Sequence, residues 1–312
     1  MTQRVKNILF IMCDQLRADY LSCYGHPHLH TPHIDALAVR GTRFTRAYVQ
    51  AAVCGPSRMS TYTGRYSMSH GATWNFVPLP VGELTLGDYL RPQGVRTAII
   101  GKTHMKPDKA GMARLGLSYR EGDGLLVSEC GFEPYARDDG IYFKAEGMPE
   151  ETYNRYLNRM GYPGANPWHD YANSGEGPDG QLLSGWNMRN ARSAARVKEE
   201  HSETAFCTDQ AMAFITEQGD KPWCLHLSFI KPHWPYIAAA PYHAMYSEQS
   251  MIAPVRSEEE RPGDPHEDRL RLGCRGSRTD RSQRDAYDQR GYHPEGEGHL
   301  GGEESIGDMK EW

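Results

Sequence analysis

Long hydrophobic runs are missing from this sequence. The N-terminal apolar run extends only from Ile8 to Cys13, whereas a helix needs about 20 apolar residues to cross a bilayer. The run is also shorter than a signal-peptide core with its cleavage region. We therefore expect no membrane partner and interpret the run as a buried strand.

The sequence also lacks a basic tract and any CxxC pair. Its net charge is -5, and no arrangement of Arg or Lys among aromatic residues stands out, which argues against nucleic acid as a partner.

The cysteines are odd in number, and a chain of this size does not need disulfides. We expect a reducing cytoplasm. The oligomeric state stays open, a homo-oligomer included. The seven cysteines are Cys13, Cys23, Cys54, Cys130, Cys207, Cys224 and Cys274.

Helical and strand patterns alternate over the first 255 residues. Thr31 as an N-cap, Pro32 at the first helical position and the terminating Gly41 predict one helix. Similar reasoning predicts helices over about 56–63, 85–90 and 202–218, strands over 7–13, 95–100 and 223–230, and a short β-like run over 44–49.

This order predicts an α/β fold of three layers, with helices on both faces of a mostly parallel sheet. The continuous apolarity of residues 7–13 favours a central strand covered on both faces. Ligands bind beyond the carboxyl ends of the strands in such sheets. Asp14, Lys102 and His233 each follow a predicted strand, so we expect them to converge.

Two regions depart from this regular pattern. Residues 105–195 are rich in Gly, Tyr, Pro and Asn, which indicates long loops over the sheet, where we expect substrate selectivity to reside. From residue 256 to 312 about one residue in six is apolar, and nine arginines accompany one lysine. We predict an incomplete catalytic domain over 1–255 and, over 256–312, a disordered or frameshifted tail. An ordinary charged tail is the alternative.

The clearest motif is Cys54-Gly55-Pro56-Ser57-Arg58 followed by Thr63-Gly64-Arg65. It resembles the C-x-P-S-R-x-x-x-x-T-G-R signature of formylglycine-dependent sulfatases, which belong to the alkaline-phosphatase-like superfamily. The resemblance covers about residues 5 to 255 and points to the branch of arylsulfatases, choline-sulfatases and phosphonate monoester hydrolases. In this family a maturation enzyme, here an implied partner, oxidises the cysteine to formylglycine.

The resemblance implies that Cys54 becomes both the nucleophile and a metal ligand. The hydrated aldehyde has two geminal hydroxyls, one to attack sulfur and one to expel the product. Arg58 would hold this group and offset anionic charge. The alternatives without a catalytic role are an inert buried thiol for Cys54 and a surface position for Arg58.

Asp14 and Gln15 are similar to the first metal-binding segment of the family, where two adjacent acids are common. A Gln carbonyl can still bind a hard cation, Ca²⁺ above all, or Mg²⁺ or Mn²⁺. The alternative is that both residues merely turn the chain at the end of a strand.

Two further segments imply catalytic and substrate-binding residues. Gly101-Lys102-Thr103-His104 is similar to the G-K-x-H segment of sulfatases, where the lysine contacts sulfate and the histidine assists release of the product. In the segment around Lys231 and His233, the lysine would bind a sulfate oxygen and the histidine would protonate the leaving oxygen. Asn75 corresponds to a substrate-contacting residue of phosphonate monoester hydrolases. Ordinary loop roles are the alternatives.

Four clustered histidines offer a weak zinc hypothesis, because no carboxylate or Cys pattern accompanies them; they are His26, His28, His30 and His33. Family members also supply two later metal ligands and a lysine, usually in a D-H-G segment. Asp264-Pro265-His266 does not match that segment, since no strand precedes it.

We therefore predict a hydrolase of small-molecule sulfuric esters that uses formylglycine and a divalent cation and is inactive or impaired as this chain. One alternative is a phosphonate monoester or phosphodiester hydrolase of the same superfamily, which Gln15 and Asn75 favour. Another is a non-catalytic remnant of a truncated gene.

Overall fold

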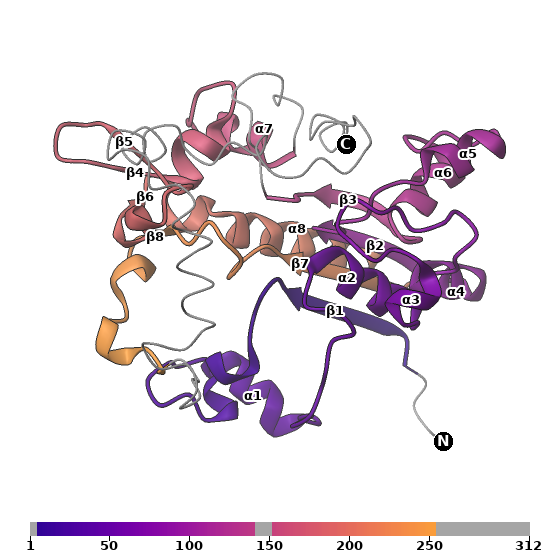
Figure 1. Ribbon diagram of the computed structural model, residues 1–312, viewed down its shortest axis with the longest axis horizontal. Helices are drawn as coiled ribbons and strands as arrows, with labels where there is room; N and C mark the ends of the chain where they lie inside the picture. Colours follow the sequence, from indigo (N-terminus) through magenta and orange to yellow (C-terminus); the bar gives the residue numbers. More distant parts are fainter. Residues whose placement is uncertain (1–4, 141–151, 254–312) are drawn as a thin grey trace, which may run out of the picture.

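The computed structural model of the protein describes residues 5–140 and 152–253. A parallel four-stranded sheet forms its centre, in the order β1-β7-β2-β3, and these strands follow one another in Figure 1. The strands are β1 (Asn7–Cys13), β2 (Arg96–Gly101), β3 (Glu133–Arg137) and β7 (Trp223–Phe229). In register, Cys13 lies opposite Phe229, and Gly101 lies opposite Ser228.

Helices cover both faces of this sheet. Ile100 and Leu225 share one buried cluster with Phe206 and Phe214 of α8 (Glu203–Gln218). The side chains that alternate with them, such as Ile99, pack in a second cluster with residues of α2 (Cys54–Thr63). Alternate residues of a strand point to opposite faces, so the layers run α8, sheet, α2. The predicted three-layer α/β fold is confirmed.

Local signals placed the four predicted helices correctly to within about two residues at their starts. Thr85 and Asp88 form a capping box on α4 (Leu86–Leu90), and the Ser202 side chain accepts a hydrogen bond from the N–H of Ala205 at the start of α8. Helix α1 spans Pro32–Arg40, as the sequence predicts. Helix α2 begins at Cys54, two residues before the predicted start.

The predicted place of the first strand is wrong within the described residues. Strand β1 lies at an edge of the sheet, and Ile8 and Ile11 are 39% and 47% exposed. Residues 44–49 are not a strand either. Residue types alone favour extended backbone in both segments. Whether a paired strand lies on each side of them depends on the rest of the fold.

Residues 105–195 contain more regular structure than predicted. Strand β3 joins the main sheet as its other edge, where Pro134 is tolerated, and its mixed polarity hid it from the sequence pattern. The other elements here are α5 (Lys109–Arg114), α6 (Gly122–Ser128), α7 (Thr152–Arg159), β4 (Ser174–Glu176), β5 (Leu182–Ser184) and β6 (Ala194–Ala195), which pairs with β8 (Ala238–Ala239).

Short elements connect these parts of the fold. They are the helix α3 (Ser67–His70), a π-helical turn at Trp168–Ala172, and 3₁₀ turns at Ala18–Tyr20, Ser22–Tyr24, Arg91–Gln93, Met188–Arg192, Glu199–His201, Tyr242–Ala244 and Glu248–Ser250. No helix among the described residues is long and apolar enough to span a membrane. The six described cysteines are free. The predicted tail, with Asp264-Pro265-His266 and Cys274, and its boundary at residues 255 and 256 lie outside the described residues.

Candidate active site

Side chains from three strand ends and one helix start meet at the carboxyl edge of the sheet. Ligand atoms of Asp14, Cys54 and His233 all lie within 4.8 Å of one another. Asp14 follows β1, and its N–H donates to the carbonyl of Phe229 at 3.0 Å, which fixes it beside the end of β7. Lys102, directly after β2, donates from Nζ to Asp14 Oδ2 at 2.6 Å. The predicted convergence of Asp14, Lys102 and His233 is therefore present.

Arg58 lies beneath this cluster and is only 3% exposed. Its Nη1 donates to the Lys102 carbonyl at 2.7 Å and to Ser228 Oγ at 2.8 Å. Its Nη2 lies 3.5 Å from Asp14 Oδ2 and makes no hydrogen bond within the described part of the chain. One end of the guanidinium is thus hydrogen-bonded by protein, and the other is paired with the Asp14 carboxylate without a hydrogen bond of its own.

Asp14 stays ionised between these cations. Burial raises the pKa of Asp14, but the charges of Lys102 and Arg58 outweigh that effect, so the net pKa is lower than usual. An anionic oxygen at this position suits a hard cation.

The backbone is unusual immediately after two of these strands. Gln15 and His104 have φ values of 63° and 56°, a left-handed conformation that costs energy for residues other than glycine. Such strain often occurs at functional sites. The Gln15 side chain is exposed, and its predicted role as a metal ligand stays a prediction.

Both predicted catalytic histidines are uncharged at neutral pH in this environment. Burial, with the nearby charge of Lys102, lowers the pKa of His104 to about 3, and its Nδ1 has no hydrogen-bond partner among the described residues. Burial, again with Lys102, also lowers the pKa of His233. The Trp234 carbonyl contacts Nδ1 of His233, so this nitrogen carries the proton and Nε2 is the atom left for chemistry.

The donor atoms fit a divalent cation. Two oxygen ligands at about 2.0–2.6 Å from one ion are at most about 5 Å apart, and the three atoms of Asp14, Cys54 and His233 satisfy this limit. A matured residue 54 would replace the soft sulfur by oxygen, which hard cations prefer. Asp14 and residue 54 would thus hold the ion, and His233 lies next to it with Nε2 free to donate a proton.

The comparisons with known proteins agree with this geometry. The profile of the sulfatase family matches residues 6–290. This chain belongs to the sulfatase family. The protein is 33% identical over 265 residues to the multifunctional alkaline phosphatase superfamily protein PehA of Trinickia caryophylli, which covers 81% of this chain and 47% of the relative. It is 26% identical over 283 residues to the choline-sulfatase of Rhizobium meliloti, covering 88% of this chain and 48% of that protein.

Solved structures of sulfatase relatives share the fold. The phosphonate monoester hydrolase of Agrobacterium radiobacter superposes with a TM-score of 0.64 at 28% identity, over 81% of this chain and 46% of that one. The enzyme of the same name from Silicibacter pomeroyi also gives 0.64, at 27% identity, over 81% and 47% of the two chains. The chain thus spans about half the length of the relatives it matches.

Asn75 has a defined contact beside the sulfatase cysteine. Its Oδ1 accepts a hydrogen bond from the N–H of Gly55 at 2.9 Å, in the first turn of α2. A Cβ on Gly55 would approach Asn75 Cα and Oδ1 to 3.0 Å. Asn75 therefore fixes the turn that carries Cys54, and its contact with substrate stays a prediction.

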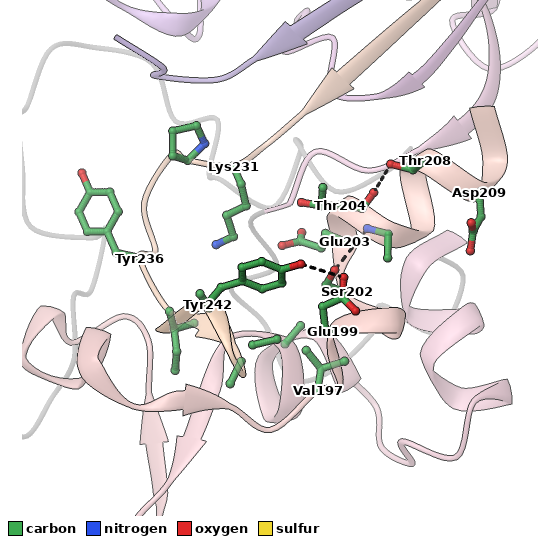
Figure 2. A pocket seen from close by; sticks show the side chains of 17 residues that line it. Val197, Glu199, Ser202, Glu203, Thr204, Thr208, Asp209, Lys231, Tyr236 and Tyr242 are labelled. Carbon is green, nitrogen blue, oxygen red and sulfur yellow. Dashed lines mark hydrogen bonds between the residues drawn. The ribbon is translucent and has the colours of Figure 1, made fainter. Parts of the chain in front are cut away.

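Lys231 is held by the loop that carries His233. Its Nζ donates to the carbonyl of Pro235 at 2.6 Å, and burial lowers its pKa. Figure 2 shows it with Glu203 and Tyr242 in the lining of a cavity of about 660 Å³. Asp14, Cys54 and His233 are not part of that lining, so binding of a sulfate oxygen by Lys231 stays a prediction.

The clustered histidines form no metal-ligand group within residues 5–140 and 152–253. Nδ1 of His26 accepts hydrogen bonds from the N–H groups of His28 and Leu29 at 3.1 and 2.8 Å. His26 thus shapes its own loop.

Sequence reasoning missed three buried residues that contact Arg58 directly or through one another: Tyr62, His226 and Ser228. The available signal was the presence of two polar residues, two positions apart, in the otherwise apolar strand β7. Such residues need buried partners.

Proposed function

We propose that this chain carries the nucleophile of a formylglycine-dependent hydrolase of sulfuric esters. The observation that supports this most is the meeting of Cys54 with Asp14 and His233, next to Lys102 and Arg58. A monoanionic ester finds there two cationic side chains, a nucleophile position and a histidine.

The place of Cys54 suits an oxygen nucleophile that handles anions. It is the first residue of α2 and is partly exposed, and a helix N-terminus favours negative charge. After oxidation and hydration, one hydroxyl at position 54 would lose its proton and attack sulfur, while the bond between sulfur and the ester oxygen breaks.

The surrounding side chains then have separate roles. Arg58 and Lys102 would offset negative charge on the transferring group. His233, protonated once an anionic substrate raises its pKa, would donate from Nε2 to the leaving oxygen. His104 would accept a proton from the second hydroxyl at position 54 when product leaves. A divalent cation at Asp14 would supply the charge that lowers the pKa of the attacking hydroxyl.

Modification of Cys54 tests this function. After coexpression with a maturation enzyme, we expect peptide mapping to find residue 54 as the aldehyde, which reacts with hydrazides. Cys23, partly buried in another loop, serves as the internal control and should stay a thiol. A Cys54 peptide that alkylates fully as a thiol, despite active maturation enzyme, would contradict the proposal.

A phosphonate monoester hydrolase is the second candidate, because the solved structures with the TM-score of 0.64 carry that name. Sulfate esters and phosphonate monoesters are both monoanions with a tetrahedral centre, so the same cations serve both. Parallel measurement of kcat/KM on an aryl sulfate and an aryl phosphonate decides between them.

A further inference from the structure

A two-rung ladder of polar side chains joins helix α2 to strand β7. Arg58 donates to Ser228 Oγ at 2.8 Å, and the Tyr62 hydroxyl lies 2.9 Å from His226 Nε2. Four helical residues advance about 6 Å, and two strand residues advance about 6.6 Å. The spacing of Arg58 and Tyr62 therefore matches that of Ser228 and His226, and the ladder fixes the helix against the strand.

The direction of each hydrogen bond in this ladder is determined. Nδ1 of His226 lies 3.1 Å from the carbonyl of Phe10, which can only accept, so Nδ1 carries the proton. Nε2 is then an acceptor, and the Tyr62 O–H must donate to it. The lone pairs of the Tyr62 oxygen remain for Arg58 Nη1, at 3.4 Å.

Burial protects this arrangement from changes of charge. His226 is fully buried, stacks on Phe10 at 4.5 Å between ring centroids and lies 5.6 Å from the Phe132 ring. Burial lowers the pKa of His226 to about 3, with the charges of Arg58 and Arg137 acting the same way. Burial likewise raises the pKa of Tyr62. Both groups are neutral over the whole physiological range.

The ladder determines how Arg58 faces the site. The two hydrogens of Nη1 point at Lys102 O and Ser228 Oγ, with the Tyr62 oxygen as a third, longer acceptor. Nη2 points toward Asp14 and makes no hydrogen bond with the described residues. Rotation of the guanidinium would remove that nitrogen from the place where an anion is expected.

We propose that Tyr62 and His226 are positioning residues: His226 orients the Tyr62 hydroxyl, and the Tyr62 oxygen keeps the guanidinium of Arg58 turned with Nη2 toward Asp14, on the side of the proposed anion site. This inference rests on the proposed function for the identity of the anion.

Tyr62→Phe tests the inference, with Tyr153→Phe as a matched control. Tyr153 is also fully buried, and its hydroxyl donates to the carbonyl of His201 at 2.7 Å, so both variants lose one buried hydroxyl and should lower the denaturation midpoint similarly. In the ligand-free full chain, NMR of the Arg58 side-chain N–H groups reports rotation of the guanidinium. We expect faster rotation in Tyr62→Phe and no change in Tyr153→Phe. Equal Arg58 signals in the two variants would overturn the proposal.

A second arm titrates inorganic sulfate and follows the same Arg58 signals. We expect affinity to fall about three- to tenfold in Tyr62→Phe, because one hydrogen bond to a charged group is weakened, and to stay within about twofold in Tyr153→Phe. His226→Leu should weaken binding further, since the Tyr62 hydroxyl loses its acceptor and turns its hydrogen toward Arg58. The double variant with Tyr62→Phe should recover part of that loss, whereas additive losses would contradict orientation by His226. If added sulfate does not shift the Arg58 signals of the wild type, Arg58 is not part of an anion site and the proposed function is contradicted. The measurement on the ligand-free protein still tests the positioning role of Tyr62.

Discussion

Two histidines near Arg58, one fully buried and one partly buried, remain uncharged for the same physical reason. His104 and His226 both have a pKa lowered to about 3, mainly by burial. His104 follows strand β2 and has a left-handed backbone conformation, whereas His226 lies within strand β7. The same desolvation keeps both rings neutral, one where we propose a proton acceptor and the other where we propose a positioning residue.

The buried state of His226 predicts a dependence of stability on pH. Its folded pKa of about 3 lies below the unfolded value of about 6.5, so its contribution is complete above pH 6.5. As pH falls toward 3, the unfolded chain binds a proton that the folded chain refuses, and the free energy of unfolding decreases by about 2 kcal/mol between pH 7 and 5. The difference between wild type and His226→Asn in urea denaturation should shrink by that amount.

The exposed His33 provides the control for this measurement. The difference between wild type and His33→Asn should stay constant over the same pH interval. A constant difference for His226→Asn as well would show that His226 is not buried as described.

At the scale of elements, the ends of β2 and β7 come into very close contact. Gly101, the last residue of β2, has a φ of 90°, and a Cβ there would lie 1.9 Å from the carbonyl oxygen of Ser228. Lys102 follows directly and donates its own N–H to the same oxygen at 3.3 Å. The place of the Lys102 side chain therefore depends on a glycine at 101.

Alanine at Gly101 should be far more destabilising than alanine at Gly94, which precedes the same strand. Gly94 also has a left-handed φ, of 74°, but a Cβ there would meet nothing within 4 Å. We expect Gly94→Ala to cost about 1 kcal/mol from its backbone conformation alone. We expect Gly101→Ala to cost about 3 kcal/mol or more from the added clash. Urea denaturation measures both, and equal costs would rule out the close approach of the two strands.

Turn and cap signals could be read from the sequence at this scale, whereas the order of strands could not. Thr85, Ser202 and Gly94 mark their elements through contacts within a few residues. The edge position of β1 and the inclusion of β3 depend on pairing across more than 30 residues. A strand such as β3, with Pro134 in it, carries no periodic signal that a single-sequence argument can use.

At the scale of the whole molecule, we predict little or no sulfatase turnover by this chain alone, even with Cys54 matured. The hydroxyl at position 54 must ionise near neutral pH, which requires a firmly held cation. Within the described residues, the ligand group has Asp14 as its single carboxylate, and affinity for a hard cation depends on the number and charge of its oxygen ligands. A second chain that donates further ligands would change this, so the prediction concerns the chain alone.

Aryl sulfate hydrolysis with Ca²⁺, Mg²⁺ and Mn²⁺ measures this prediction, with Cys54→Ala as the control. We expect the matured protein to stay close to the rate of the variant. Robust turnover that disappears only in Cys54→Ala would show that the chain completes its own metal site.

The sequence by itself determined the alternation of helix and strand, the motif at Cys54 and the polar residues at the strand ends. These follow from periodicity, caps and residue chemistry, which act over a few neighbouring positions. Only the tertiary structure placed Lys231 in the lining of a cavity and brought Tyr62 and His226 next to Arg58. Such contacts join residues 164 and 170 positions apart, and they form only when a helix and a strand pack at one particular register.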